Sequence, residues 1–381
     1  MEYRKLPRGE EEISTLGLGG EHLIGMSPDE VMAIFDFAMA NGVNMLDIYM
    51  PEPEVRSNIG RALQGRRERM YIQGHICATY QNNQYTRTRD LGQSKYAFDD
   101  LLTRLKTDYI DFGMIHYVDE APDLEEVLRS GIFDYARGLK RQGVIRHLGF
   151  STHNPIIAKK LIATGEIDLF MFSINPAYDL DSTNNDDVNA LIEFKAMNEA
   201  GVGVAPLRAG LYADSEKAGI GITVMKALGA GRLLSAQDSP FGQALSVTQC
   251  MHYCLTRPAV LSVMLGIHSL DELKEGLKYF TASDQEKDYA VIARSPKYAM
   301  TGKCMYCNHC LPCPSNIDIA TVMKFLDLAT IGGQVPETVR EHYSALPANA
   351  GDCILCGDCE KNCPFGVSII EKMLQAQKVF I

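Results

Sequence analysis

Two short runs near the end of the sequence contain eight of its eleven cysteines, and they constrain the chain more than any other feature. The runs are Cys304-x2-Cys307-x2-Cys310-x2-Cys313 and Cys353-x2-Cys356-x2-Cys359-x3-Cys363, each followed by a proline. Three cysteines spaced in this way can hold three corners of one iron–sulfur cube, and a fourth cysteine before a proline typically ligates a different cube. Zinc sites usually take two cysteine pairs per ion. The runs therefore favour iron–sulfur clusters over zinc or disulfides.

The two runs resemble those of two-cluster bacterial ferredoxins. That resemblance implies two [4Fe–4S] clusters, one held by Cys304, Cys307, Cys310 and Cys363 and the other by Cys353, Cys356, Cys359 and Cys313. Between the runs, apolar residues recur at helical spacing over 317–329, and a second helical stretch follows Pro336. We therefore expect residues 284–381 to form a small α-helical ferredoxin-like domain.

The composition limits the number of domains, the classes of partner and the cellular location that we expect. With 381 residues and 46% hydrophobic content, the chain supports one large core and one smaller unit with a core of its own. Its net charge of −11 makes nucleic acid or an anionic membrane an unexpected partner. The N-terminus has no apolar export segment, and no stretch is long enough to span a bilayer. Because cluster cysteines must stay reduced, we expect a cytoplasmic protein of an anaerobe.

The first three-quarters of the chain alternates short apolar runs with amphipathic stretches. Eight strand candidates occur at 14–18, 45–48, 70–76, 109–115, 146–150, 169–174, 221–225 and 262–267. The clearest helical patterns cover 28–41, 53–64, 95–106, 123–142, 155–164, 206–218 and 269–279. Eight strands alternating with helices predict a (β/α)8 TIM barrel, with its boundary near residue 283.

Several stretches of this barrel resemble the aldo-keto reductases, and in particular a bacterial branch that carries a ferredoxin-type tail. The stretches are Gly42-Val-Asn-Met-Leu-Asp47, Asp108-Tyr-Ile-Asp-Phe-Gly-Met-Ile-His116, Gly143-Val-Ile-Arg-His-Leu-Gly-Phe-Ser-Thr-His-Asn154 and Gly221-Ile-Thr-Val-Met-Lys-Ala-Leu-Gly-Ala-Gly-Arg-Leu-Leu234. The resemblance implies a reductase whose active site lies at the C-terminal mouth of the barrel.

The family's catalytic residues are only half present. The resemblance implies an Asp, a Tyr, a Lys and a His, of which Asp47 and His116 match. Glu52 stands at the position of the Tyr and His75 at that of the Lys. A carbonyl reductase needs a proton donor beside the developing alkoxide, for which Glu52, His75 and Tyr49 are the candidates. We expect Asp47, His75 and His116 to lie together, because the ends of adjacent strands meet at the mouth.

The resemblance also implies a cofactor region at the mouth, and NAD(P)H and a flavin both remain open. Its candidate residues are Ser151, Asn154, Asn175, Met225, Lys226, Gly229, Gly231, Arg232, Gly266 and Ser269. The polar segment 81–90, interpreted as a loop, holds Arg87 and Arg89, which could bind a carboxylate or phosphate.

The presence of clusters raises a question of electron number. A [4Fe–4S] cluster passes single electrons and a nicotinamide passes a hydride, so a flavin or a radical-tolerant substrate would have to connect them. Three hypotheses follow: an iron–sulfur oxidoreductase wired to a ferredoxin- or flavodoxin-type carrier, a nicotinamide-dependent reductase with structural clusters, and a non-catalytic electron-transfer or assembly subunit. For the first, we expect segment 293–303 to carry the first cysteine run back towards the mouth.

Overall fold

A computed structural model gives the structure of the protein, and it describes residues 1–82, 84–180, 204–294, 302, 304–307, 310–330, 335–363 and 365–380. Most of the segment expected to lead back towards the mouth, residues 295–301 and 303, lies outside the described residues. Where the chain is described, no helix has the length and apolar character needed to cross a membrane.

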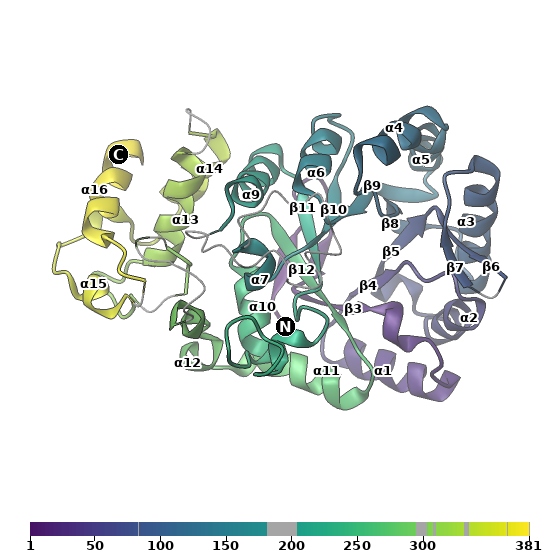
Figure 1. Cartoon of the computed structure of the whole chain (residues 1–381), viewed down its shortest axis with the longest axis horizontal. Coiled ribbons are helices and arrows are strands. Elements are labelled where there is room, and N and C mark those ends of the chain that lie inside the picture. Colours follow the sequence, from purple (N-terminus) through teal and green to yellow (C-terminus); the bar gives the residue numbers. More distant parts are fainter. Residues whose placement is uncertain are drawn as a thin grey trace.

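Eight parallel strands close into a barrel in the order β10-β11-β12-β3-β4-β5-β8-β9 (Figure 1). They are β3 (Leu16–Gly19), β4 (Met45–Ile48), β5 (Tyr71–Ile76), β8 (Ile110–Ile115), β9 (Ile145–Thr152), β10 (Leu169–Ser173), β11 (Gly221–Met225) and β12 (Val260–Gly266). Each overlaps one predicted strand, which confirms the TIM barrel. The strands are almost wholly buried because the outer helices cover them, as the near-continuous apolar runs indicate.

The outer helices begin at recognisable caps. In α1, Ser27 and Glu30 form a capping box ahead of Pro28, and Asn154 caps α6 ahead of Pro155. The barrel helices are α1 (Pro28–Ala40), α2 (Pro53–Ala62), α3 (Leu91–Leu105), α4 (Ala121–Arg129), α5 (Ile132–Arg141), α6 (Pro155–Ile162), α7 (Pro176–Asp179), α9 (Pro206–Ala218), α10 (Val247–Leu255), α11 (Leu270–Leu277) and α12 (Asp284–Lys287). The single helix expected over 123–142 is two helices, because Gly131 adopts φ 84° between them.

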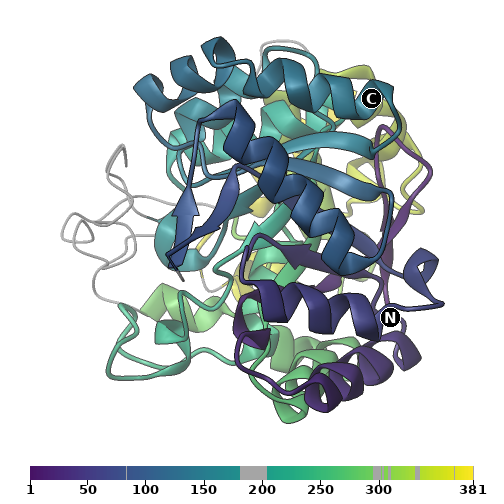
Figure 2. The same cartoon turned by 90° about the vertical axis from the view of Figure 1, so that its right-hand side faces the viewer.

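Two hairpins lie outside the barrel wall. One joins β1 (Tyr3–Lys5) to β2 (Glu12–Ser14), and the other joins β6 (Ala78–Gln81) to β7 (Gln84–Arg87). The second hairpin stands beside α3 (Figure 2). The interpretation of 81–90 as a loop was therefore wrong over β7. The segment pairs because threonine and tyrosine, which favour strands, face each other across it, as in Tyr80 opposite Tyr85.

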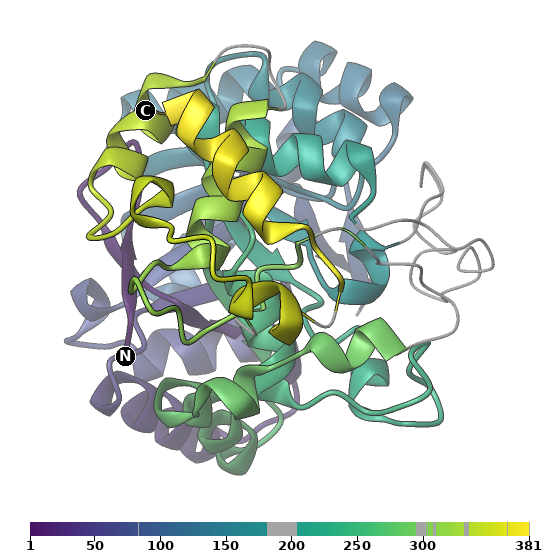
Figure 3. The same cartoon turned by 90° about the vertical axis from the view of Figure 1, so that its left-hand side faces the viewer.

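The tail is helical and lies across the outer surface of the barrel (Figure 3). It contains α13 (Ile319–Thr330), α14 (Glu337–Ser344), α15 (Asp358–Asn362) and α16 (Ile369–Phe380). Leu328 and Val339 of the tail pack on Ala213 of α9. Buried residues of barrel and tail also belong to one hydrophobic cluster, which includes Tyr253 and Met305. The expectation of separate cores was wrong, because the tail covers apolar side chains of the outer helices.

Candidate functional site

Four polar side chains meet inside the mouth of the barrel. Asp47 lies near the end of β4, Gln73 and His75 lie on β5, and His116 follows β8; all four are buried. His75 Nε2 lies 2.9 Å from Asp47 Oδ1, and its Nδ1 lies 2.8 Å from Nδ1 of His116. The side chains of Asp47, His75 and His116 therefore form one hydrogen-bonded row, as adjacency of the strands predicted.

The row continues at both ends through residues that the sequence analysis missed. On the inner side, Gln73 Nε2 donates to Asp47 Oδ1 at 2.8 Å, and its Oε1 accepts from Thr223 Oγ1 at 2.7 Å. On the outer side, the hydroxyl of Tyr85 lies 2.7 Å from His116 Nε2. Tyr85 comes from the β6–β7 hairpin. No local sequence pattern predicts that this hairpin lies over the mouth.

The hairpin is fixed over the mouth by arginines. Arg89 donates to both carboxylate oxygens of Asp123 at 2.7 Å and to the carbonyl of His116 at 3.0 Å. Arg87 donates to Asp123 at 3.1 Å and to the carbonyl of Tyr117 at 2.7 Å. The two guanidiniums proposed to bind a ligand are thus engaged within the protein, where they position Tyr85.

Two of the candidate proton donors have other partners. The carboxylate of Glu52 caps α2, accepting from the amides of Glu54 at 3.0 Å and Val55 at 2.6 Å. The ring of Tyr49 stacks on His116, with the centroids 5.3 Å apart. Burial, and then the Glu21 carboxylate, raise the pKa of Tyr49, which makes it a poor acid.

An Asp–His pair that the sequence analysis also missed lies beside this row. Asp119 Oδ2 is 2.9 Å from His153 Nδ1, and Thr152 Oγ1 and the amide of His153 donate to its Oδ1. Burial works against ionisation, but these hydrogen bonds lower the pKa of Asp119. His153 Nε2 is buried and has no hydrogen-bond partner among the described residues. The sequence signal for this pair is His153 within Ser151-Thr-His-Asn154, a stretch that the resemblance linked only to cofactor contacts.

The polar residues expected to contact a nicotinamide are largely occupied. Ser151 Oγ accepts from the amide of Tyr117 at 2.8 Å. The amide groups of Asn154 and Asn175 cap α6 and α7, and their Nδ2 atoms donate to the carbonyls of Asp119 and Lys226, both at 2.9 Å. These three side chains therefore support the mouth loops in this arrangement.

The remaining expected cofactor residues surround the ends of β11 and β12. Met225 ends β11, and Lys226, Gly229 and Gly231 all adopt positive φ in the loop that leads to Arg232. At β12, the His22 ring covers Gly266, since a Cβ there would lie 2.2 Å from it, and it stacks on His268 at 3.9 Å. Ser269 caps α11, with Glu272 in the first turn. We derive no step through a dinucleotide.

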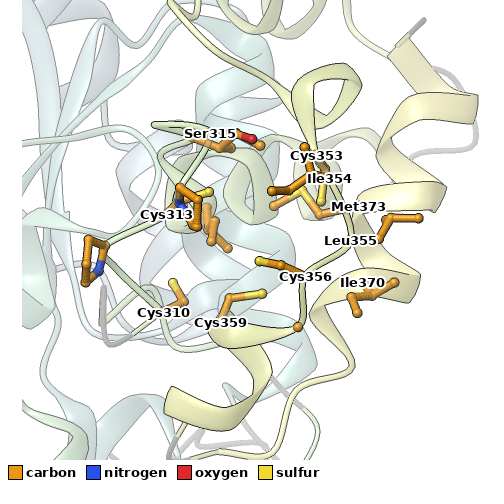
Figure 4. Close-up of a pocket in the computed structure, with 15 residues that line it drawn as sticks. Cys310, Cys313, Ser315, Cys353, Ile354, Leu355, Cys356, Cys359, Ile370 and Met373 are labelled. Atoms are coloured by element: carbon orange, nitrogen blue, oxygen red, sulfur yellow. The ribbon is translucent and has the colours of Figure 1, made fainter.

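In the tail, the eight cysteines of the runs line two cavities. Cys304, Cys307, Cys310 and Cys363 line one. Cys313, Cys353, Cys356 and Cys359 line the other, which Cys310 also touches (Figure 4). Burial raises the pKa of the Cys310 thiol to about 12. Among the described residues, no three His, Cys, Asp or Glu side chains are placed to hold a metal ion. Each four-cysteine set fits a four-iron cube.

Comparison with known proteins agrees with both halves of this description. The Aldo/keto reductase family matches residues 15–295, and a 4Fe-4S dicluster domain matches residues 303–368. The chain therefore belongs to the aldo/keto reductase family and has an iron–sulfur dicluster domain after its barrel. This makes it an oxidoreductase that acts on small molecules.

Relatives share the barrel. The uncharacterized oxidoreductase YqkF of Bacillus subtilis is 27% identical over 297 residues, which is 73% of this chain and 90% of that protein. Protein tas of Escherichia coli is 29% identical over 40% of this chain and 52% of its own length. The solved aldo-keto reductase AKR11C1 of Bacillus halodurans has a TM-score of 0.59 at 21% identity, covering 77% of this chain and 95% of that one. The last likeness concerns the fold.

Proposed function

We propose that the protein is an iron–sulfur oxidoreductase in which a substrate at the barrel mouth exchanges electrons with two [4Fe–4S] clusters in residues 284–381. Cys304, Cys307, Cys310 and Cys363 would hold one cluster, and Cys313, Cys353, Cys356 and Cys359 the other. When bound, the clusters supply single electrons. A ferredoxin- or flavodoxin-type protein is the proposed external carrier, and the row from Asp47 to Tyr85 is the proposed reaction site.

A buried bridge of side chains between tail and barrel carries the proposal. Arg257, 1% exposed, donates to the carbonyl of Met305 at 2.8 Å, between the first two cysteines of the first run. Its guanidinium lies 4.9 Å from the ring centre of Tyr306 and 4.3 Å from that of Tyr253. A charged group is costly to bury, so its retention at this contact favours a functional junction between the two units.

The bridge continues towards the mouth. The hydroxyl of Tyr253 donates to Asp179 Oδ2 at 3.0 Å, and Asp179 ends α7, which follows β10 at the mouth. The first cysteine run thus contacts the outer layer of the barrel at Arg257, just after α10. This contact supports electron exchange, while the approach expected of segment 293–303 falls mostly outside the described residues.

The test starts with anaerobic protein whose clusters have been reduced and freed of excess reductant. On addition of pyridine-3-carboxaldehyde, we expect loss of the reduced-cluster electron paramagnetic resonance signal and formation of about one alcohol per chain, because the aldehyde takes up two electrons and two protons. Persistence of the signal, with reduction by NAD(P)H alone, would establish the nicotinamide-dependent alternative. Reduction by neither donor would favour the non-catalytic subunit.

A matched pair of variants tests the bridge. Tyr253 and Tyr212 are both buried and both donate a hydroxyl to Asp179, at 3.0 and 2.5 Å. Of the two, Tyr253 is the one that contacts Arg257. We expect Tyr253→Leu to slow reoxidation of the clusters by the aldehyde and Tyr212→Leu to leave that rate near the wild-type value. Equal rates in the two variants would exclude this path.

A further inference from the structure

The hydrogen bonds of the mouth row fix the direction in which its protons point. An ionised Asp47 only accepts, so His75 must donate to it from Nε2. When both histidines are neutral, Nδ1 of His75 is an acceptor, and Nδ1 of His116 is its donor. Nε2 of His116 then accepts from the hydroxyl of Tyr85. In this state every proton of the row points inward, towards Asp47.

One added proton reverses the outer half of the row. With both nitrogens of His75 protonated, its Nδ1 donates to Nδ1 of His116, whose Nε2 then carries the proton and donates to the oxygen of Tyr85. The hydroxyl hydrogen of Tyr85 is thereby released from the row and points towards the mouth. The inner end holds no titrating group, because Gln73 and Thr223 close it. Among the described residues of the row, Tyr85 is therefore the one that can pass the proton to and from the mouth.

We propose that Tyr85 is the catalytic acid and base of this site, and that His116, His75 and Asp47 form a relay that stores the proton it transfers. The inference rests on the proposed function, since it concerns the proton that accompanies electron transfer at the same mouth. It assigns to the β6–β7 hairpin the role for which Tyr49 and Glu52 were the sequence-based candidates.

The position of Tyr85 fits this role. The residue is 42% exposed while its hydroxyl bonds to the buried His116, so one side chain contacts both the mouth and the relay. Burial raises the pKa of Tyr85 and Glu21 adds to this effect, while Arg87 and Arg89 oppose it. Burial also raises the pKa of Tyr49, and the Glu21 and Asp47 carboxylates both add to that effect. The hairpin cannot easily move away, because Arg89 ties it to Asp123 and to the carbonyl of His116.

The surroundings limit the relay to a single stored proton. His116 faces His75 from β5, Tyr49 from the end of β4, Tyr85, Arg87 and Arg89 from the hairpin segment, and His153 from the end of β9. Burial, and then the charge of a protonated His75 and of the arginines, lower the pKa of His116 well below its ordinary value. In the reversed state of the row, Asp47 accepts from His75 and is the carboxylate that balances the added charge.

The proton step balances without any electron transfer. The O–H bond of Tyr85 breaks as an O–H bond forms on the substrate oxyanion. His116 Nε2 returns a proton to the tyrosine oxygen, and Nδ1 of His75 returns one to Nδ1 of His116. The relay ends neutral at both histidines with Asp47 still ionised, and it is reloaded from solvent through Tyr85. Oxidation of an alcohol uses the same steps in reverse.

The first test does not depend on turnover. In the holoprotein labelled with 15N-histidine, we expect nuclear magnetic resonance to show His116 as the Nδ1–H tautomer at high pH and as the Nε2–H tautomer once the relay takes up its proton. Tyr85→Phe should shift the Nε2 resonance of His116. Tyr80→Phe, across the hairpin from Tyr85, should not. An unchanged tautomer across the titration, or equal spectra of the two variants, would overturn the relay.

The second test measures catalysis with reduced protein and pyridine-3-carboxaldehyde. We expect Tyr85→Phe to lower the turnover number about 100-fold or more at unchanged KM, and Tyr80→Phe to behave as wild type. The wild-type rate should fall as pH rises and the relay empties, and the residual rate of Tyr85→Phe should lose that dependence. A Tyr85→Phe rate within threefold of wild type would overturn the assignment. If the wild type itself gives no alcohol, the proposed function fails, and the resonance test alone decides the relay.

Discussion

Glu52 shows how a residue in a family's catalytic position can serve the fold. Its carboxylate binds two amides in the first turn of α2, which would otherwise lack partners. We therefore predict that Glu52→Ala lowers the free energy of unfolding by about 1 kcal/mol. Glu52→Asn, which restores a capping oxygen, should recover most of this loss in a urea titration. A Glu52→Asn variant as unstable as Glu52→Ala would contradict the capping role.

The half-buried His252 of α10 leads us to predict a loss of stability in acid. Burial, followed by the charges of Lys287 and Arg257, lowers the pKa of His252 from 6.5 to about 4. An unfolded chain binds the proton more readily, so the contribution of His252 is fully present above pH 6.5 and is lost as the pH falls towards 4. The loss amounts to roughly 2–4 kcal/mol. Between pH 7 and pH 4, the free energy of unfolding of His252→Gln should decrease less than that of the wild type, by this amount.

At the residue scale, the sequence predicted only those members of the row that lie at the ends of neighbouring strands. Asp47, His75 and His116 end neighbouring strands, so their meeting follows from the barrel. Tyr85 joins them through a hairpin packed over the mouth, and Gln73 reaches Thr223 across the barrel interior. Such contacts depend on tertiary packing and have no period or motif. The partners of Ser151 and Asn154 were hidden for the same reason.

At the scale of elements, we expect alanine substitutions at two helical glycines to change stability in opposite directions. A Cβ on Gly60 in α2 would lie 2.1 Å from the carbonyl oxygen of Arg104 in α3, so the two helices can pack this closely only with glycine. On Gly138 in α5, the nearest atom to a Cβ is a flexible arginine nitrogen 3.9 Å away. We predict that Gly60→Ala costs about 1–3 kcal/mol, and that Gly138→Ala gains up to about 1 kcal/mol. Thermal unfolding of the two variants checks this contrast.

The elements themselves were largely predictable from apolar periodicity. All eight barrel strands, and α13 and α14 of the tail, lie where the pattern placed them. The errors occurred where a local signal was weak. Gly131 interrupts an otherwise continuous helical pattern, and α10 packs on all sides and so lacks a polar face. The β6–β7 hairpin has short strands in a polar segment. In each case tertiary packing overrode the pattern.

At the scale of the whole molecule, one hydrophobic core joins barrel and tail. Replacing a cysteine of the first run should therefore affect the barrel differently from replacing a cysteine of the second run. Cys304 precedes Met305, whose carbonyl binds the buried Arg257 beside α10. Cys356 is exposed, on the second run. Without the first cluster, the segment that pairs with Arg257 loses its anchor, and a buried charge left without its partner is strongly destabilising.

We therefore predict that Cys304→Ala loosens the barrel as well as the tail, whereas Cys356→Ala affects chiefly its own cluster. The measurement is anaerobic hydrogen exchange of peptides from α10 (Val247–Leu255), with the iron content of each variant determined in parallel. Each variant should lose about four iron atoms. Faster exchange in α10 should appear in Cys304→Ala and not in Cys356→Ala, because the first run contacts Arg257 just after that helix. Equal protection of α10 from hydrogen exchange in both variants would mean that the barrel is stable without its tail. The shared core would then contribute little to the stability of the barrel.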